Sequence, residues 1–472
     1  MDNFHFNKFI GNYFYLLLSQ AIAYISNFGI ALVLARKMDI SHFGEFFLLL
    51  TIQSFFLLIA DSGLNSFYLR CVSQDNSLIN KYLNNIIPLK ISLFLGSYLL
   101  MQAFVLIFGY SSQVVKLSYI FGLSLMPFSL NSLISFTFRA IGRMDRELVS
   151  NVISGIMVAL YVIWLSFVRA DIFEAVLMWV MLHTLSLLFN LYLLRRTLAI
   201  RLKVDFSQWG LLLSESKYFL LFFLTSWCYI QANTIIISRY LPVSEVGLYQ
   251  SALKILMVSV MLGDVMLNNF FPFIIRKYFE SPEEGKLLIS KISELVMSLV
   301  WPILLIEIFF SKEIIAILYG NQFEKAVVPL VILGIGYLFY YAPPYGLLLA
   351  YIGHQKTNFY IALGSAFVNI ILNFHLIPRN GIVGAATATA LTYAGMKIAY
   401  MLVFAMAGLP LYSLGIARLT IIMLSLAVIV RQLHVHFMYG LSLYFLLIGI
   451  YTYKKYFTNG YFDYHYQYQE GK

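Results

Sequence analysis

Apolar runs of about 20 residues recur from one end of this chain to the other, each long enough to cross a bilayer as a helix. Only 11% of the 472 residues are charged, whereas soluble proteins carry about 25%. A membrane β-barrel would instead show alternating segments of about 10 residues. The sequence therefore predicts an all-α polytopic membrane protein.

We expect about fourteen transmembrane helices, with a polar stretch at residues 195–216 after the sixth. The first six are expected at residues 9–35, 43–60, 86–108, 117–138, 149–168 and 176–194. The next six are expected at 218–237, 249–275, 287–310, 327–350, 359–377 and 383–406. Two weaker apolar runs follow at 414–430 and 438–453.

The basic residues predict the orientation of these helices. If the N-terminus is inside, 21 of the 32 Lys and Arg residues fall in inside segments, Lys90 among them, and nine in outside loops. The remaining two, Lys254 and Lys397, lie within spans. Because cytoplasmic loops carry an excess of Lys and Arg, we expect both termini in the cytoplasm. The same loops account for the net charge of +10, so we expect no nucleic-acid partner.

The chain also contains an internal repeat. The segment ALVLARKMDISHFGEF at residues 31–46 returns as TIIISRYLPVSEVGLY at residues 234–249, so that Gly44 aligns with Gly247. Without a gap, Asp61 then aligns with Asp264. A repeat in so apolar a chain is typical of transporters built from two homologous halves.

The repeat predicts the division of the chain into lobes. Its copies lie six spans apart, and an even number gives the two lobes parallel topology. We expect an N-terminal six-helix lobe at residues 1–205 and a C-terminal six-helix lobe at 206–410. Residues 411–472 would add two extra helices and a polar cytoplasmic tail. We assign the motif's Arg36, Gly44, Arg239 and Gly247 a structural role at the outer helix ends.

Several kinds of catalysis find no support in the sequence. It has no phosphate-binding G-x-x-x-x-G-K-[ST] loop, no H-E-x-x-H and no C-x-x-C. Its two cysteines, Cys71 in an expected inside loop and Cys228 in a helix, match neither a disulfide nor a metal site. No expected loop is long enough to fold as a soluble catalytic domain. We therefore expect a protein that is not an enzyme and has no cofactor.

Three groups of motifs resemble one known family. Arg36 precedes FGEF at residues 43–46 and DSGL at 61–64, LYGNQFEKA lies at 318–326, and PRNGIVGAA lies at 378–386. In this order they resemble bacterial polysaccharide flippases, which are O-antigen or capsule repeat-unit translocases. These flippases belong to the multidrug/oligosaccharidyl-lipid/polysaccharide (MOP) exporter superfamily.

The resemblance implies a fold and a function. It implies two pseudo-symmetric six-helix lobes around a central cavity, in the bacterial cytoplasmic (inner) membrane. It also implies that an undecaprenyl-pyrophosphate-linked oligosaccharide is flipped to the periplasmic leaflet by alternating access, for O-antigen or capsule biosynthesis. Coupling to H+ or Na+ stays open, as does whether the two extra helices bind the lipid tail or are accessory.

The expected partners are the lipid-linked oligosaccharide and membrane lipids, with the polysaccharide polymerase and chain-length machinery as further candidates. An ion-coupled multidrug exporter of the same superfamily is one alternative function. A membrane polysaccharide polymerase is another, although the short outer loops argue against it.

Charges within spans are costly and therefore mark candidate sites. We predict that Lys254 and Lys397 bind the pyrophosphate, since a buried phosphate group needs cationic partners. The alternative is that they snorkel toward the membrane surface or pair with carboxylates. Glu307, His183 and His375 are weaker candidates, for proton coupling.

The repeat-related Asp61 and Asp264 lie near the predicted cytoplasmic ends of their helices. We predict that they form an inner gate by pairing with basic residues. The alternative is that Asp61 only caps its helix or contacts interfacial water. The basic candidates are Arg70, Lys90 and Arg139.

Neutral polar and aromatic residues complete the candidate site. The polar residues predicted to line the cavity are Asn12, Gln20, Asn27, Gln231 and Asn233. They would bind sugar hydroxyls or, alternatively, join neighbouring helices. The tyrosines predicted to stack on sugar rings are Tyr337, Tyr340 and Tyr341, near the helix-breaking Pro343 and Pro344. Alternatively, these tyrosines belong to an aromatic belt at the membrane interface.

Overall fold

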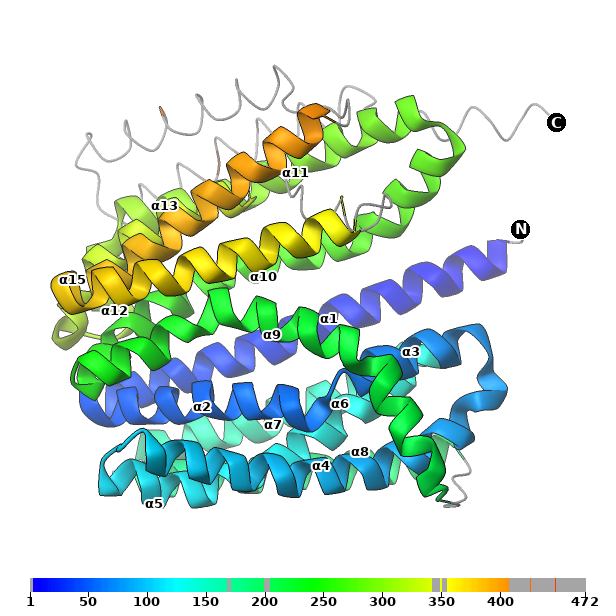
Figure 1. The fold of residues 1–472 in the computed structure, drawn as a ribbon, viewed down its shortest axis with the longest axis horizontal. Helices are drawn as coiled ribbons and strands as arrows, with labels where there is room; N and C mark the ends of the chain where they lie inside the picture. The colour runs from blue at the N-terminus through cyan, green and yellow to red at the C-terminus, as the bar shows by residue number, and fades with distance from the viewer. Residues whose placement is uncertain are drawn as a thin grey trace. The chain divides into compact units, whose positions relative to one another are not determined.

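The computed structural model of the protein describes residues 3–167, 171–198, 204–341 and 355–406, with single positions at 349, 425 and 446. Within these ranges every regular element is a helix and there is no strand. Among the described residues, ten helices are long and apolar enough to cross a membrane. These features confirm the predicted all-α polytopic fold (Figure 1). The two extra helices and the tail expected at residues 411–472 lie outside the described ranges, save for two single positions.

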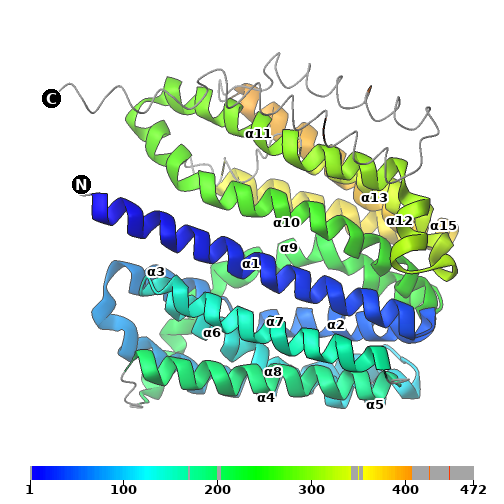
Figure 2. The ribbon, with the colours of Figure 1, turned by 180° about the vertical axis from the view of Figure 1, so that it is seen from behind.

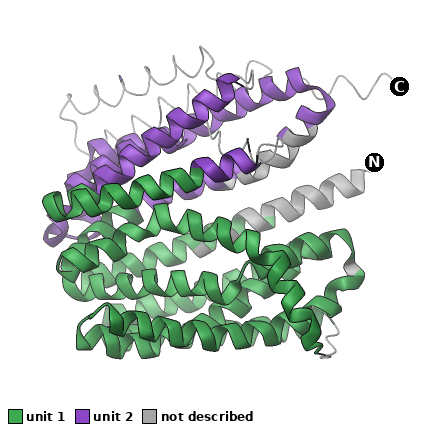
Figure 3. Ribbon diagram, viewed as in Figure 1, with its two compact units in different colours: residues 1–254, 362–385 green, residues 255–361, 386–472 purple. Residues whose placement is uncertain are grey.

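The chain packs into two compact units (Figure 3). The first contains residues 1–254 and 362–385, and the second contains 255–361 and 386–472. The long helix α10 (Val243–Glu280) begins in the first unit and ends in the second, and α15 (Gln355–Met406) contributes to both. The predicted lobes, with boundaries at residues 205 and 410, stay a prediction.

The described part of the first unit contains nine further α-helices and three short 3-10 helices. They are α1 (Asn3–Lys37), α2 (Ile40–Asp61), α3 (Leu64–Gln74), η1 (Asn76–Leu78), α4 (Ile79–Ile107), α5 (Ser112–Phe121), η2 (Gly122–Ser124), α6 (Leu125–Ala140), α7 (Met144–Phe167), α8 (Ile172–Thr197), η3 (Phe206–Gln208) and α9 (Trp209–Tyr240). The helix α1 packs along α7, as the view from behind shows (Figure 2).

In its described residues, the second unit adds three α-helices and one 3-10 helix. They are α11 (Pro282–Phe309), α12 (Ser311–Leu318), η4 (Asn321–Ala326) and α13 (Val327–Tyr341). In α15, Gly381 has φ 60° and ψ −143°, which interrupts the helix between the spans predicted at 359–377 and 383–406. The span predicted at 117–138 corresponds to α5, η2 and α6 in sequence.

The short helix α3 was not predicted, and Cys71 lies on it rather than in a loop. Its apolar side is buried, because Leu64 and Tyr68 pack into a cluster with Leu83 of α4 and Leu133 of α6. Burial of this side explains why a segment that is more polar than the spans still folds as a helix against them.

The polar stretch after α8 is also ordered where it is described. Asp205 caps η3, and hydrogen bonds from Ser207 and Gln208 hold the pKa of its carboxyl below its usual value. The backbone N–H of Asp205 donates to Oδ1 of Asn85 on α4 at 2.8 Å. The entry to α9 is thereby attached to α4.

Candidate functional site

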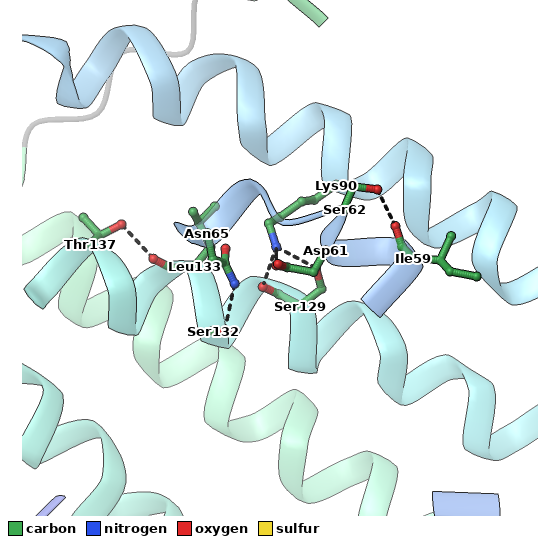
Figure 4. A network of polar contacts seen from close by, with 9 residues as sticks. All are labelled: Ile59, Asp61, Ser62, Asn65, Lys90, Ser129, Ser132, Leu133 and Thr137. Carbon is green, nitrogen blue, oxygen red and sulfur yellow. Dashed lines mark hydrogen bonds and ion pairs between the residues drawn. The ribbon is translucent and has the colours of Figure 1, made fainter. Parts of the chain in front are cut away.

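A sharp break joins α2 to α3. Ser62 and Gly63 both have left-handed backbones, with φ 47° and 73°. A Cβ atom on Gly63 would lie 2.6 Å from the carbonyl oxygen of Ser216 and 2.8 Å from the backbone nitrogen of Leu220, both on α9. Only glycine fits this conformation and this close approach. The break leaves Asp61 as the last residue of α2, facing α4 and α6 (Figure 4).

Asp61 forms an ion pair with Lys90 of α4, a residue that is only 1% exposed. The Lys90 ammonium also donates to the Ser129 carbonyl oxygen at 3.3 Å and to Ser129 Oγ at 3.0 Å, on α6 (Figure 4). An ammonium has three donors, and here it has three acceptors. Of the three predicted basic partners, Lys90 is therefore the one that pairs with Asp61.

The position of Lys90 corrects one expectation. The distribution of basic residues predicts Lys90 in an inside segment, but it lies on α4 and its side chain is fully buried. The Asp61 carboxylate makes this burial tolerable, because a paired and fully hydrogen-bonded charge avoids most of the cost of desolvation.

The other two predicted partners bind different carboxylates. Arg139 donates to both oxygens of Glu147, with an Nε to Oε2 distance of 2.8 Å, and Glu147 is 1% exposed. Arg70 lies 3.7 Å from Glu215 on the surface, with its guanidinium 5.5 Å from the centre of the Phe67 ring. Arg139 therefore joins α6 to α7, and Arg70 joins α3 to α9.

Lys254 has an unusual environment. Its ammonium lies 5.0 Å from the centre of the Phe47 ring on α2. Among the described residues no carboxylate lies within ion-pair distance of it. A cation–π contact contributes about 0.5–2 kcal/mol in most cases, whereas desolvating an ammonium costs several kcal/mol. An anion bound here would therefore stabilise the Lys254 charge.

The second predicted pyrophosphate ligand, Lys397, lies on the second half of α15 and is 6% exposed. Lys397 belongs to the second compact unit, whereas Lys254 belongs to the first, as the last residue of its segment 1–254. Both lysines are thus helical, as predicted, and their role as anion ligands stays a prediction.

A chain of buried amides lies in the same unit as Lys254. Asn373 of α15 donates to Asn233 Oδ1 at 2.6 Å and to Asn369 Oδ1 at 2.9 Å. Asn233 in turn donates to the hydroxyl of Tyr249 at 2.8 Å, and Gln250 donates to Thr234 Oγ1 at 2.7 Å. These bonds join α9, α10 and α15, so Asn233 connects helices in this structure.

The remaining predicted cavity residues differ in position. Gln231 is half-buried on α9, and Asn27 is exposed on α1. The side chains of Asn12 and Gln20 lie outside the described part of the structure. Binding of sugar hydroxyls by any of these residues stays a prediction.

In the second unit, Asp264 accepts a hydrogen bond from the Tyr341 hydroxyl at 2.8 Å. The same hydroxyl lies 2.8 Å from the Val260 carbonyl oxygen. The rings of Tyr337 and Tyr340 pack on Tyr393, with centroid distances of 5.2 and 5.1 Å. The predicted sugar-stacking tyrosines therefore form one aromatic cluster between α13 and α15, and Asp264 is attached to it.

The weaker candidates for proton coupling occupy three separate environments. Glu307 is 5% exposed and accepts from Ser259 Oγ at 2.9 Å. His183 stacks on Phe128 with a centroid distance of 3.9 Å. His375 is exposed and hydrogen-bonds Arg379.

Sequence reasoning missed several residues that the structure brings to these sites. Asn369 and Asn373 are four residues apart in an apolar helix, and this spacing alone would have placed them on one face. Phe47 and Ser129 carry no such signal, because their contacts depend on which helices pack together.

The fold and the buried charges define a class, that of polytopic helical membrane proteins with ionisable groups inside their spans. Solved structures of this class share the fold. A lipid II flippase MurJ in an inward closed conformation superposes with a TM-score of 0.69 at 13% identity, covering 95% of this chain and 99% of that one. An inward-facing MATE family multidrug transporter of the MOP superfamily gives 0.62 at 12% identity, covering 85% and 95%.

The family follows from sequence. The model of the polysaccharide biosynthesis protein family matches residues 9–278, so this chain belongs to that family. The "probable low-salt glycan biosynthesis flippase Agl15" of Haloferax volcanii is 30% identical over 196 residues, which is 41% of each chain. The alignment thus spans about two fifths of that relative's length. These findings confirm the resemblance to polysaccharide flippases of the MOP superfamily.

Proposed function

We propose that this protein flips an undecaprenyl-pyrophosphate-linked oligosaccharide from the cytoplasmic to the outer leaflet by alternating access. The step would serve the synthesis of a surface polysaccharide such as O-antigen or capsule. The observation that carries this proposal is the family match over residues 9–278. The similarity to a glycan flippase and the fold shared with a lipid II flippase support it.

The charges of the described residues suit such a substrate. Lys254 has a ring but no carboxylate beside it, and a pyrophosphate would supply the missing negative charge. Lys397 is the second proposed ligand, since it is a buried cation within a span. The Asp61–Lys90 pair is the proposed inner gate, which would have to separate when the cytoplasmic side opens.

We further propose that both termini are cytoplasmic. We also propose that the polymerase and chain-length proteins act with this chain, and that an H+ or Na+ gradient can couple to it.

The test is the leaflet on which substrate accumulates when the protein is removed from its cell. A flippase defect leaves lipid-linked repeat units on the cytoplasmic leaflet, out of reach of a membrane-impermeant reagent added outside. A polymerase defect leaves single repeat units on the outer leaflet. Accumulation on the outer leaflet would contradict the proposal.

The similarity to a MATE transporter favours one second candidate, an ion-coupled multidrug exporter. Such an exporter would favour buried carboxylates, whereas Lys397 is a buried cation and Lys254 a half-buried one. Expression in a drug-sensitive host distinguishes the two functions. Increased drug resistance that requires Asp264 or Glu307 would support the exporter, and unchanged resistance would support the flippase.

A further inference from the structure

The two copies of the repeat contact each other directly, at equivalent positions. A Cβ atom on Gly44 of α2 would collide with the Val243 carbonyl oxygen and lie 3.0 Å from the Gly247 nitrogen. A Cβ atom on Gly247 of α10 would lie 2.6 Å from the Ile40 carbonyl oxygen and 3.1 Å from the Gly44 nitrogen. Val243 is the repeat equivalent of Ile40. The contact is therefore reciprocal, as a local two-fold axis requires.

The reciprocal contact continues along both helices. Phe47 and Thr51 of α2 are the repeat equivalents of Gln250 and Lys254 of α10. Lys254 lies over the Phe47 ring, while Gln250 Nε2 lies 3.5 Å from Thr51 Oγ1. Helical spacing places positions 44, 47 and 51 on one face of α2. We call this contact the α2–α10 seam, made of Gly44, Phe47 and Thr51 with Gly247, Gln250 and Lys254.

The seam is closely packed where the glycines meet, because the space that a Cβ atom would need on either glycine is taken by backbone atoms of the other helix and, at Gly247, also by the Ile40 side chain. Nothing the size of a sugar passes such a contact. The end of α2 and α10 that carries Gly44 and Gly247 is the predicted outer end. Lys254 lies seven residues farther along α10, or about 10 Å toward the cytoplasm.

We propose that the Gly44–Gly247 contact is the outer closure of the transport pathway and separates when substrate is released. This inference rests on the proposed function, and it gives the two glycines a role beyond scaffold. The glycines allow the two backbones to approach closely, and this makes the closed state tight. An anion held at Lys254 would lie directly below the closure.

The test measures whether the seam is open to the outer solution, and it needs no substrate. Both native cysteines are replaced (Cys71→Ser, Cys228→Ser), and Thr51→Cys places a reporter at a position that is 4% exposed. A membrane-impermeant maleimide is then added to the outer face of intact cells. With both glycines present, we expect the reporter to be protected.

The variant Gly44→Ala with Gly247→Ala adds two methyl groups where there is no space, and should raise the labelling rate about tenfold by shifting the closed state toward open. Each single substitution should give a smaller increase in the labelling rate. The single variants replace the double variant in the test if the double variant does not fold. Gly96→Ala on α4 is the matched control, because a Cβ there has no neighbour within 4 Å.

Two results would overturn the closure. One is unchanged labelling in a folded Gly44→Ala/Gly247→Ala protein. The other is an increase that occurs only when the maleimide is added to the cytoplasmic face in inverted vesicles. Because labelling is read without substrate, failure of the flipping assay and failure of the closure are separate results.

Discussion

At the residue scale, two lysines of one unit, the buried Lys90 and the half-buried Lys254, differ in what compensates their charge. Lys90 has a carboxylate and two further acceptors, whereas Lys254 has an aromatic ring. A fully paired buried charge is fixed in place, because removing either partner exposes the other to the cost of desolvation. The first lysine therefore suits a structural or gating pair, and the second suits an exchangeable anion.

Replacing Lys90 by Met should destabilise the protein by about 3 kcal/mol, because it leaves the Asp61 carboxylate without its partner. Adding Asp61→Asn should recover most of this loss, since both charges are then gone. Unfolding in detergent, followed by tryptophan fluorescence, measures the three variants. Lys286→Met is the control, because its pair with the exposed Glu283 contributes less than about 1 kcal/mol. A Lys90→Met variant as stable as this control would contradict the account.

At the element scale, backbone geometry and buried amides determine how helices meet. The α2–α3 break depends on Gly63, and the joint of α9 with α15 depends on Asn233 and Asn373. Each can be tested separately, because the two features share no residue.

The substitution Gly63→Ala should lower the stability of the protein clearly more than Gly109→Ala does. Both glycines have a left-handed backbone, with φ 73° and 68°, so alanine at either costs about 1 kcal/mol in strain. At Gly63 the new methyl group also meets α9, whereas at Gly109 nothing lies within 4 Å. Thermal unfolding of the two variants gives the comparison. Equal losses of stability would show that α9 does not confine the break.

The Asn233–Asn373 hydrogen bond should contribute about 0.6 to 1.7 kcal/mol of coupling, the range found for polar pairs between membrane helices. A double-mutant cycle with Asn233→Ala and Asn373→Ala measures it as a difference in unfolding free energy. If the coupling is zero and both variants instead lower flipping, the alternative that Asn233 binds sugar hydroxyls is favoured.

At the scale of the whole molecule, the sequence predicts more of the fold than of the site. Runs of apolar residues predict nearly every described helix, because each must span a bilayer of fixed thickness. The short helices α3 and α12 escaped prediction, and the burial of α3 depends on neighbours distant in sequence. Lys254 was identified as a charge in a span, but its partner Phe47 was not, because one aromatic residue among the 41 phenylalanines gives no signal.

The same limit applies to the repeat. Alignment paired Gly44 with Gly247 and suggested two scaffold positions, but it could not show that the two positions touch. Equivalence in sequence carries no information about distance. The reciprocal contact emerges only from the packing of α2 on α10.

The most direct test of the central claim is flipping by the purified protein in liposomes. A defined lipid-linked oligosaccharide is incorporated, and its exposure on each leaflet is read with a membrane-impermeant glycan-modifying reagent, with and without an H+ or Na+ gradient. We predict that the wild-type protein moves the substrate between leaflets. Lys254→Ala should slow this at least about tenfold, the loss expected for one charge-assisted contact, while Lys286→Ala should not. No flipping by the wild-type protein under any gradient, or wild-type flipping by Lys254→Ala, would contradict the account.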